Sequence, residues 1–149
     1  MIYGKLIHAV KYLQAAAARL SASNETLYNG VAVTAAAGTG IDSRGYDEIN
    51  IVLNAGTFEG AANLAASVVE SDTDDSTAAT AVTSASFTAI TTANDEAIHT
   101  ASIRCMGTKR YLWLKTVQTG SATSRYSALA ILGKEDVAPS DNSPVFDLL

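Results

Sequence analysis

Residues 109–119, KRYLWLKTVQT, give the strongest single indication of the fold. In an extended chain, successive side chains point to opposite faces. Here that alternation separates Leu112 and Leu114 from Tyr111 and Trp113. The stretch therefore predicts a β-strand with the leucines on one face and Trp113 on the other. We expect at least one of these two faces to be buried between sheets.

Other segments carry related strand signals. The Asn-Gly pair within TLYNGVAVTA (26–35) predicts a tight hairpin turn. In DEINIVLNAG (47–56), alternate residues are Ile49, Ile51 and Leu53. Gly, Asn, Asp, Ser and Thr clusters separate these runs at roughly regular spacing, which favours an all-β, antiparallel β-sandwich of jelly-roll type. Further strands are expected at 64–71, 86–91, 96–104 and 125–132, and AGTGIDSRGY (37–46) is expected to be a loop.

The first twenty residues carry a different pattern. Apolar residues recur at spacings of four and three, as on one face of an amphipathic helix: Leu6, Val10, Leu13, Ala17 and Leu20. An extended arm that docks on another surface is the alternative. We therefore divide the chain into an N-terminal helical or extended arm (1–25), a β-sandwich domain (26–138) and an extended C-terminal tail (139–149).

The tail contains both prolines of the chain, Pro139 and Pro144, which favour an extended backbone. It ends on apolar residues, and apolar chain ends usually dock on their own domain or on a neighbour. We predict that residues 1–20 or 140–149 contact a neighbouring chain; the alternative is that both ends fold back on their own domain. The candidate protein-interaction residues are Ile2, Tyr3, Leu6, Ile7, Val10, Leu13, Val145, Phe146, Leu148 and Leu149.

Composition narrows the classes of function. A length of 149 residues suits one domain, and a net charge of −5 with scattered basic residues argues against a nucleic-acid partner. No stretch approaches the ~20 apolar residues of a membrane helix, so we expect a soluble protein without a membrane partner. A single cysteine, Cys105, excludes an internal disulfide and a multi-thiolate zinc site, and is expected to be a small packed side chain.

The acidic stretch VVESDTDDST (68–77) resembles the start of an EF-hand calcium loop. Such a loop needs a glycine at its sixth position and a glutamate at its twelfth. Those positions hold Thr77 and Thr83, so the stretch is expected to be a solvated turn between strands.

No catalytic pattern stands out in the sequence. Neither of the two histidines, His8 and His99, has a second histidine at metal-ligand spacing, and no G-x-S-x-G motif marks a nucleophilic serine. We therefore expect no enzyme activity, no metal and no cofactor.

Several stretches in their order resemble the capsid decoration, or cement, proteins of tailed bacteriophages. Gly45-Tyr46 precedes an apolar strand, Glu70-Ser71-Asp72 ends a strand, and Lys109-Arg110-Tyr111 begins a later one. The resemblance covers residues 38–139 and rests on the order of the motifs. The turn that follows Ser71 is longer than in the family.

The resemblance implies a structural virion protein that is made in the bacterial host cytoplasm. It would bind the outer surface of an icosahedral head of the HK97 type, stabilise contacts between subunits of the major capsid protein, and associate with further copies of itself as a trimer. The alternative is a carbohydrate-binding or adhesive β-sandwich on a phage head or tail, with Tyr111, Trp113 and Tyr126 as a stacking surface. An inward-facing Trp113 would leave no such surface.

Overall fold

The computed structural model describes residues 6–15, 25–32, 37–120 and 124–134. Within these ranges nearly all regular structure is β, with one short 3-10 turn, and no helix there has the length and hydropathy to span a membrane. The elements are β1 (Leu6–Ala15), β2 (Glu25–Tyr28), β3 (Val31–Ala32), β4 (Ile41–Asp42), β5 (Glu48–Phe58), β6 (Asn63–Ser71), η2 (Ser76–Ala78), β7 (Thr80–Ser86), β8 (Ile98–Arg104), β9 (Tyr111–Thr119) and β10 (Ser124–Lys134).

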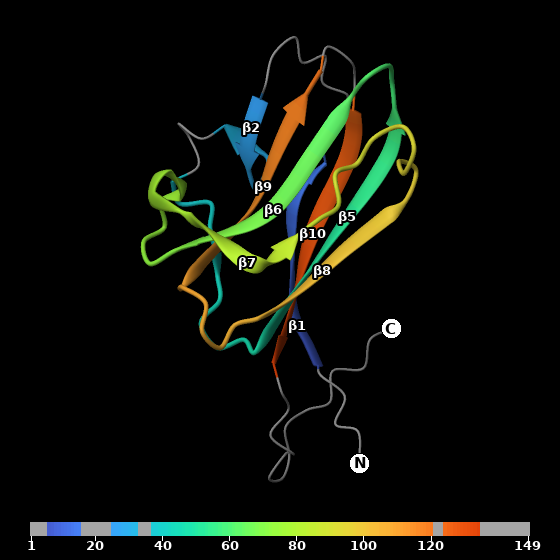
Figure 1. Cartoon of the computed structure of the whole chain (residues 1–149). Helices are drawn as coiled ribbons and strands as arrows, with labels where there is room; N and C mark the ends of the chain where they lie inside the picture. Colours follow the sequence, from blue (N-terminus) through green and yellow to red (C-terminus); the bar gives the residue numbers. More distant parts are fainter. Residues whose placement is uncertain (1–5, 16–24, 33–36, 121–123, 135–149) are drawn as a thin grey trace.

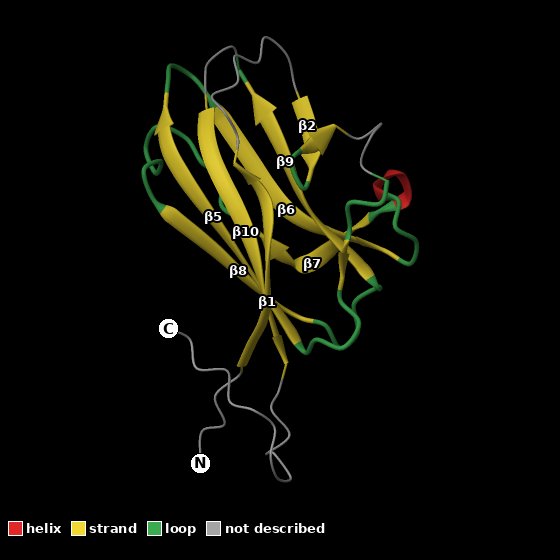
Figure 2. Cartoon of the chain, turned by 180° about the vertical axis from the view of Figure 1, so that it is seen from behind, coloured by secondary structure: helices red, strands yellow, loops and turns green. Residues whose placement is uncertain are grey.

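The strands form two antiparallel sheets that pack against each other (Figures 1 and 2). The four-stranded sheet has the order β1-β10-β5-β8. The six-stranded sheet has the order β3-β2-β9-β6-β7, and β4 also pairs with β9. The predicted all-β sandwich is therefore confirmed.

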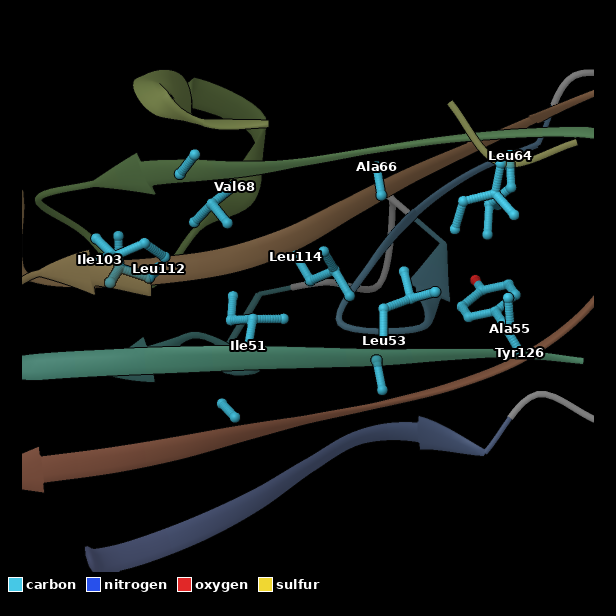
Figure 3. Packing of buried hydrophobic residues seen from close by; sticks show 14 of the residues in the cluster. Ile51, Leu53, Ala55, Leu64, Ala66, Val68, Ile103, Leu112, Leu114 and Tyr126 are labelled. Atoms are coloured by element: carbon cyan, nitrogen blue, oxygen red, sulfur yellow. The ribbon is translucent and has the colours of Figure 1, made fainter. Parts of the chain in front are cut away.

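The main hydrophobic core lies between the two sheets (Figure 3). Ile51 and Leu53 of β5 face Leu112 and Leu114 of β9 across it, and all four are buried. On β10 two of the four buried core residues, Ala128 and Ala130, are alanines, which take little space beside these larger side chains. The alternation predicted for β5 and β9 is thus confirmed.

The opposite face of β9 is buried as well. Trp113 has an exposed fraction of 0% and packs with Tyr28 and Val69 in a second, smaller cluster outside the six-stranded sheet. β9 is therefore covered on both sides, which explains why its sequence is apolar at successive positions.

The Asn-Gly hairpin forms as predicted between β2 and β3. Asn29 and Gly30 have φ angles of 47° and 79°, and a two-residue hairpin turn with positive φ at both positions matches the twist of its strands. The Asn29 side chain accepts a hydrogen bond from the Leu114 backbone N–H at 2.8 Å and donates one to the Thr39 carbonyl at 2.8 Å. The turn is therefore anchored to β9 and to the following loop.

Two predicted segments are wrong in detail. Residues 6–15 form β1, an edge strand paired with β10, and not a helix; the extended alternative is correct for this range, and β1 belongs to the sandwich rather than to a separate arm. The strand expected at 86–91 lies earlier, at Thr80–Ser86, and Ile90 makes only an isolated bridge to Leu64. Within the expected loop at 37–46, two residues form β4.

Candidate functional site

The predicted interaction residues fall into two groups. Leu6, Ile7, Val10 and Leu13 lie on β1, where the register shifts twice along β10. The others lie outside the described residues: Ile2, Tyr3, Val145, Phe146, Leu148 and Leu149. Since β1 pairs with β10 of the same chain, residues 6–15 contact their own domain.

The pairing of β1 with β10 fixes where the two chain ends leave the sandwich. Leu6, the first residue of β1, is the register partner of Lys134, the last residue of β10. Both strands reach this point at the lower end of the sandwich in Figure 1. Residues 1–5 and 135–149 are therefore attached at neighbouring positions.

Two turns pack together at the same end. Turn 105–110 joins β8 to β9, and Ser43 donates from its N–H and its Oγ to the carbonyl of Arg110, both at 2.9 Å. Asp47 accepts from the N–H of Cys105 at 2.9 Å and donates its own N–H to the carbonyl of Gly133 at 2.9 Å. We call residues 43–47 and 105–110, together with Leu6 and Lys134, the terminal surface.

Met106 projects from the terminal surface. Its exposed fraction is 93%, the larger of the two values for exposed large hydrophobic residues in the described part of the chain. The next residue, Gly107, has a φ of 95°, a conformation that suits glycine and turns the chain at the tip between β8 and β9. A methionine held at such a tip is unbranched and adapts its shape to a partner surface.

Two arginines of the terminal surface share one carboxylate. Nη2 of Arg110 and Nη2 of Arg44 each lie 2.9 Å from Oδ2 of Asp42. The hydrogen bonds from Arg110, and next those from Arg44, hold the pKa of the Asp42 carboxyl well below its usual range. The Arg110 guanidinium also stacks over the ring of Tyr111, with its Cζ 4.6 Å from the ring centroid.

This cluster is too exposed to contribute much stability. The side chain of Asp42 is 38% exposed and that of Arg44 is 66% exposed, and ion pairs in such positions are strongly screened by water. The pairs direct both guanidinium groups toward Asp42 at the surface. Arginine and tyrosine are enriched in the energetically important parts of protein interfaces.

The acidic stretch is more than a solvated turn. Asp74 accepts the Gly40 N–H on Oδ1 at 2.8 Å, Asp75 accepts from the Thr77 N–H at 2.9 Å, and Glu70 accepts from the Lys109 N–H at 3.0 Å. The two hydrogen bonds from Thr77 lower the pKa of Asp75. The stretch is therefore the predicted turn between two strands, β6 and β7, and three of its four acids, all partly exposed, also accept hydrogen bonds there.

Asp74 positions the loop that covers the tryptophan, residues 38–40, which we call the covering loop. The Gly38 N–H donates to the carbonyl of Asp74 at 3.0 Å, and the indole Nε1 of Trp113 donates to Thr39 Oγ1 at 3.2 Å. A Cβ at Gly40 would lie only 2.6 Å from Asp74 Oδ1 and 2.9 Å from a ring carbon of Trp113. Only glycine fits there.

This packing removes the predicted aromatic platform. Trp113 lies beneath the covering loop, and Tyr126 is buried in the main core with its hydroxyl 2.9 Å from Thr116 Oγ1. Of the three proposed stacking residues, Tyr111 alone is partly exposed, and Arg110 occupies one of its faces. The predicted stacking surface is wrong.

The histidines and the cysteine that the sequence offered as candidates for chemistry lie in ordinary parts of the fold. His99 places Nε2 3.2 Å from the Asn94 carbonyl, and Cys105 is a free, half-buried thiol against the main core. Among the residues with described positions, no three His, Cys, Asp or Glu side chains converge to hold a metal ion. His8 is a β1 residue at a register shift.

Sequence reasoning did not find the terminal surface. Lys109-Arg110 was visible as the single adjacent basic pair, but its contact with Asp42 joins residues 68 positions apart. The sequence feature that could have predicted an exposed turn is Gly107, which follows Met106 in the short segment between two strand-like stretches.

Comparison with known proteins gives one structural likeness. No family model and no curated protein matches this chain. The crystal structure of PBSX exported protein XepA matches with a TM-score of 0.55 and 15% identity, over 95% of this chain and 43% of that one. This chain thus spans less than half the length of XepA. At this identity the likeness shows only that this chain shares its fold with the matched part of XepA.

Proposed function

We propose that this chain is a structural protein of a bacteriophage particle, and specifically a capsid decoration protein. It binds the outside of an icosahedral head through the terminal surface and stabilises contacts between subunits of the major capsid protein. The observation that carries the proposal is the convergence of three features at one end of the sandwich: both attachment points of the chain ends, the exposed Met106, and the paired Arg44 and Arg110.

A protein that stabilises a shell must contact two subunits at once. The terminal surface suits this because residues 1–5 and 135–149 are attached beside each other at Leu6 and Lys134. Fifteen residues after Lys134 can span roughly 50 Å when extended. The apolar residues near both ends, including Phe146, would remove area from water on a neighbouring capsid subunit at ~25 cal/mol per Å².

The fixed part of the surface adds a central contact. Fully burying a methionine side chain contributes roughly 1.5–3 kcal/mol, which corresponds to about a tenfold to hundredfold change in affinity. Arg44 and Arg110 belong to the same terminal surface and add hydrogen-bond donors to it, so the matching capsid surface would combine an apolar pocket with acidic or carbonyl groups.

Two further observations support the phage assignment. PBSX exported protein XepA, which shares the fold, is a phage-related protein. The net charge of −5 also disfavours a role inside the head against DNA, since DNA contacts need clustered basic residues. On this proposal the protein has no catalytic activity, and its partners are the major capsid protein and further copies of itself.

The test is binding of the purified chain to empty expanded heads, measured as copies per head after co-sedimentation. Met106→Ser should lower the affinity about tenfold or more, whereas Met106→Leu, which keeps an apolar tip, should bind nearly as the natural chain does. Removal of residues 140–149 should lower occupancy while leaving the thermal unfolding of the sandwich unchanged. Binding that none of these changes weakens would refute attachment through the terminal surface.

Absence of any binding to heads would refute the decoration role itself. The same experiment with residues 1–5 removed separates the contributions of the two chain ends.

A further inference from the structure

The edges of the two sheets differ in how they are protected. Edge strands expose unpaired backbone groups, and proteins commonly shorten, bulge or charge them to prevent pairing with another chain. Among the described strands, β3 and β4 have two residues each, β1 pairs with two register shifts, and β7 pairs with one. β8 has seven residues, contains no proline or lysine, and pairs with β5 without a shift.

The backbone of β8 offers a regular set of groups on its outer side. At its two ends, the Ala97 carbonyl accepts the Ala55 N–H and the Cys105 N–H donates to the Asp47 carbonyl, both at 2.9 Å. Odd-numbered residues therefore direct their N–H and C=O groups toward β5. Along an antiparallel strand, the backbone N–H and C=O groups of successive residues point to alternate sides. The even-numbered residues therefore direct their backbone groups away from β5: Ile98, Thr100, Ser102 and Arg104.

No described strand occupies that outer side. β7 runs nearby, but it belongs to the other sheet and pairs with β6. Facing sheets lie about 10 Å apart, so a strand of one sheet does not fill the lateral position beside an edge of the other. All four even-numbered residues of β8 are exposed, and Ile98 has an exposed fraction of 68%.

We propose that β8 pairs with β8 of a second copy of this chain, antiparallel and about a two-fold axis at Ala101. In this register Thr100 lies opposite Ser102 of the second copy, and the outward backbone groups of the even-numbered residues meet each other. Ile98 lies opposite Arg104, whose alkyl stem covers apolar surface while the guanidinium stays in water.

The charges of the strand agree with this arrangement. Apart from His99, Arg104 is the one ionisable side chain of β8. The two copies of Arg104 come to lie at opposite ends of the paired strands, roughly 20 Å apart at ~3.3 Å per residue. No like charges therefore face each other directly, as they would in a parallel, in-register pairing.

This self-association is independent of the terminal surface, which lies beyond the Arg104 end of β8. An isologous two-fold contact closes on itself and gives a dimer. It therefore differs from the trimer that the resemblance to decoration proteins implied, and the mass of the assembly distinguishes the two.

The experiment is sedimentation equilibrium of the full chain over a range of concentrations. We expect a mass of twice the 15.4 kDa chain at the higher concentrations. Thr100→Pro removes an outward N–H without touching the ladder to β5, and should give a monomer. Ile98→Lys, which sets a lysine opposite Arg104 of the second copy, should also give a monomer. Met106→Ser is the matched control and should remain dimeric.

Thermal unfolding separates loss of pairing from loss of fold, because Ile98→Lys changes an exposed side chain and should unfold near the natural temperature. A natural chain that stays monomeric at every concentration, a mass of three chains, or a dimer that both variants retain would each overturn the proposal. Met106→Ser should bind heads more weakly and yet dimerise as the natural chain does, so failure of this proposal is distinguishable from failure of the proposed function.

Discussion

Replacing Asp74 by alanine tests how the second cluster is held together. The substitution removes the carboxylate that accepts the Gly40 N–H at 2.8 Å and so frees the covering loop above Trp113. Hydrogen bonds to charged groups contribute about 1.5–3 kcal/mol, and partial exposure of this site brings the expected loss of unfolding free energy to about 1–2 kcal/mol. For a domain of this size that corresponds to a fall in Tm of roughly 3–8 °C.

Trp113 is the single tryptophan of the chain, so its emission reports on this site directly. In the natural protein the indole is buried and its emission should be blue-shifted and poorly quenched by acrylamide. In Asp74→Ala we expect a red shift and stronger quenching at temperatures below the main transition. Asp72→Ala, a change two residues away at an exposed position, is the matched control and should alter neither property.

Equal stability and equal quenching in Asp74→Ala and Asp72→Ala would refute the reasoning. The covering loop would then be held by its other contacts, such as the Asn29 amide, without help from the acidic turn.

Three further expectations concern the core, the ion pairs and metals. Leu112→Ala or Leu114→Ala should cost about 2–5 kcal/mol in denaturant unfolding, and a near-neutral result for both would mean that the register of β9 is shifted. Asp42→Asn should lower the unfolding free energy slightly at neutral pH, because a carboxyl whose pKa is lower in the folded state stabilises the fold at pH values above its unfolded-state pKa near 4. The difference in unfolding free energy between the natural chain and the variant should shrink as the pH falls toward the folded-state pKa. A difference that is the same at every pH would contradict this. Calcium or zinc should shift Tm by no more than about a degree, whereas a larger rise that Asp72→Ala abolishes would reveal a metal site.

Much of the sandwich could be predicted from local pattern. The alternation in β5 and β9 and the Asn29-Gly30 pair each determine a strand or turn within a few residues of sequence. The alternation also determines which side chains are buried, because a shift of one residue in strand register would turn Ile51 or Leu114 from the core to the opposite face of its sheet.

The N-terminal strand could not be predicted in this way. A β-bulge inserts an extra residue and breaks the period of two, and β1 shifts register between Ile7 and Ala9 and again between Tyr12 and Gln14. The resulting spacing of apolar residues imitates a helix. Pairing with β10, which lies more than a hundred residues later, determines the strand.

The surface contacts were equally hidden. Arg110 and Asp42 meet only because β4 pairs with β9, and Asp74 reaches Gly40 only because the acidic turn folds back over Trp113. No local sequence motif predicts these contacts, because each joins residues that are far apart in the chain. Met106 carried no periodic signal because its exposure depends on the turn that holds it.

The orientation of the sandwich on a decorated head tests the central claim most directly. Image reconstruction of expanded heads saturated with the purified chain would show which end of the domain contacts the shell. We predict that the terminal surface, with turns 43–47 and 105–110, lies against the capsid protein and that Met106 is buried there. A sandwich bound with this end facing solvent, and with the opposite end or a sheet face on the shell, would contradict the account.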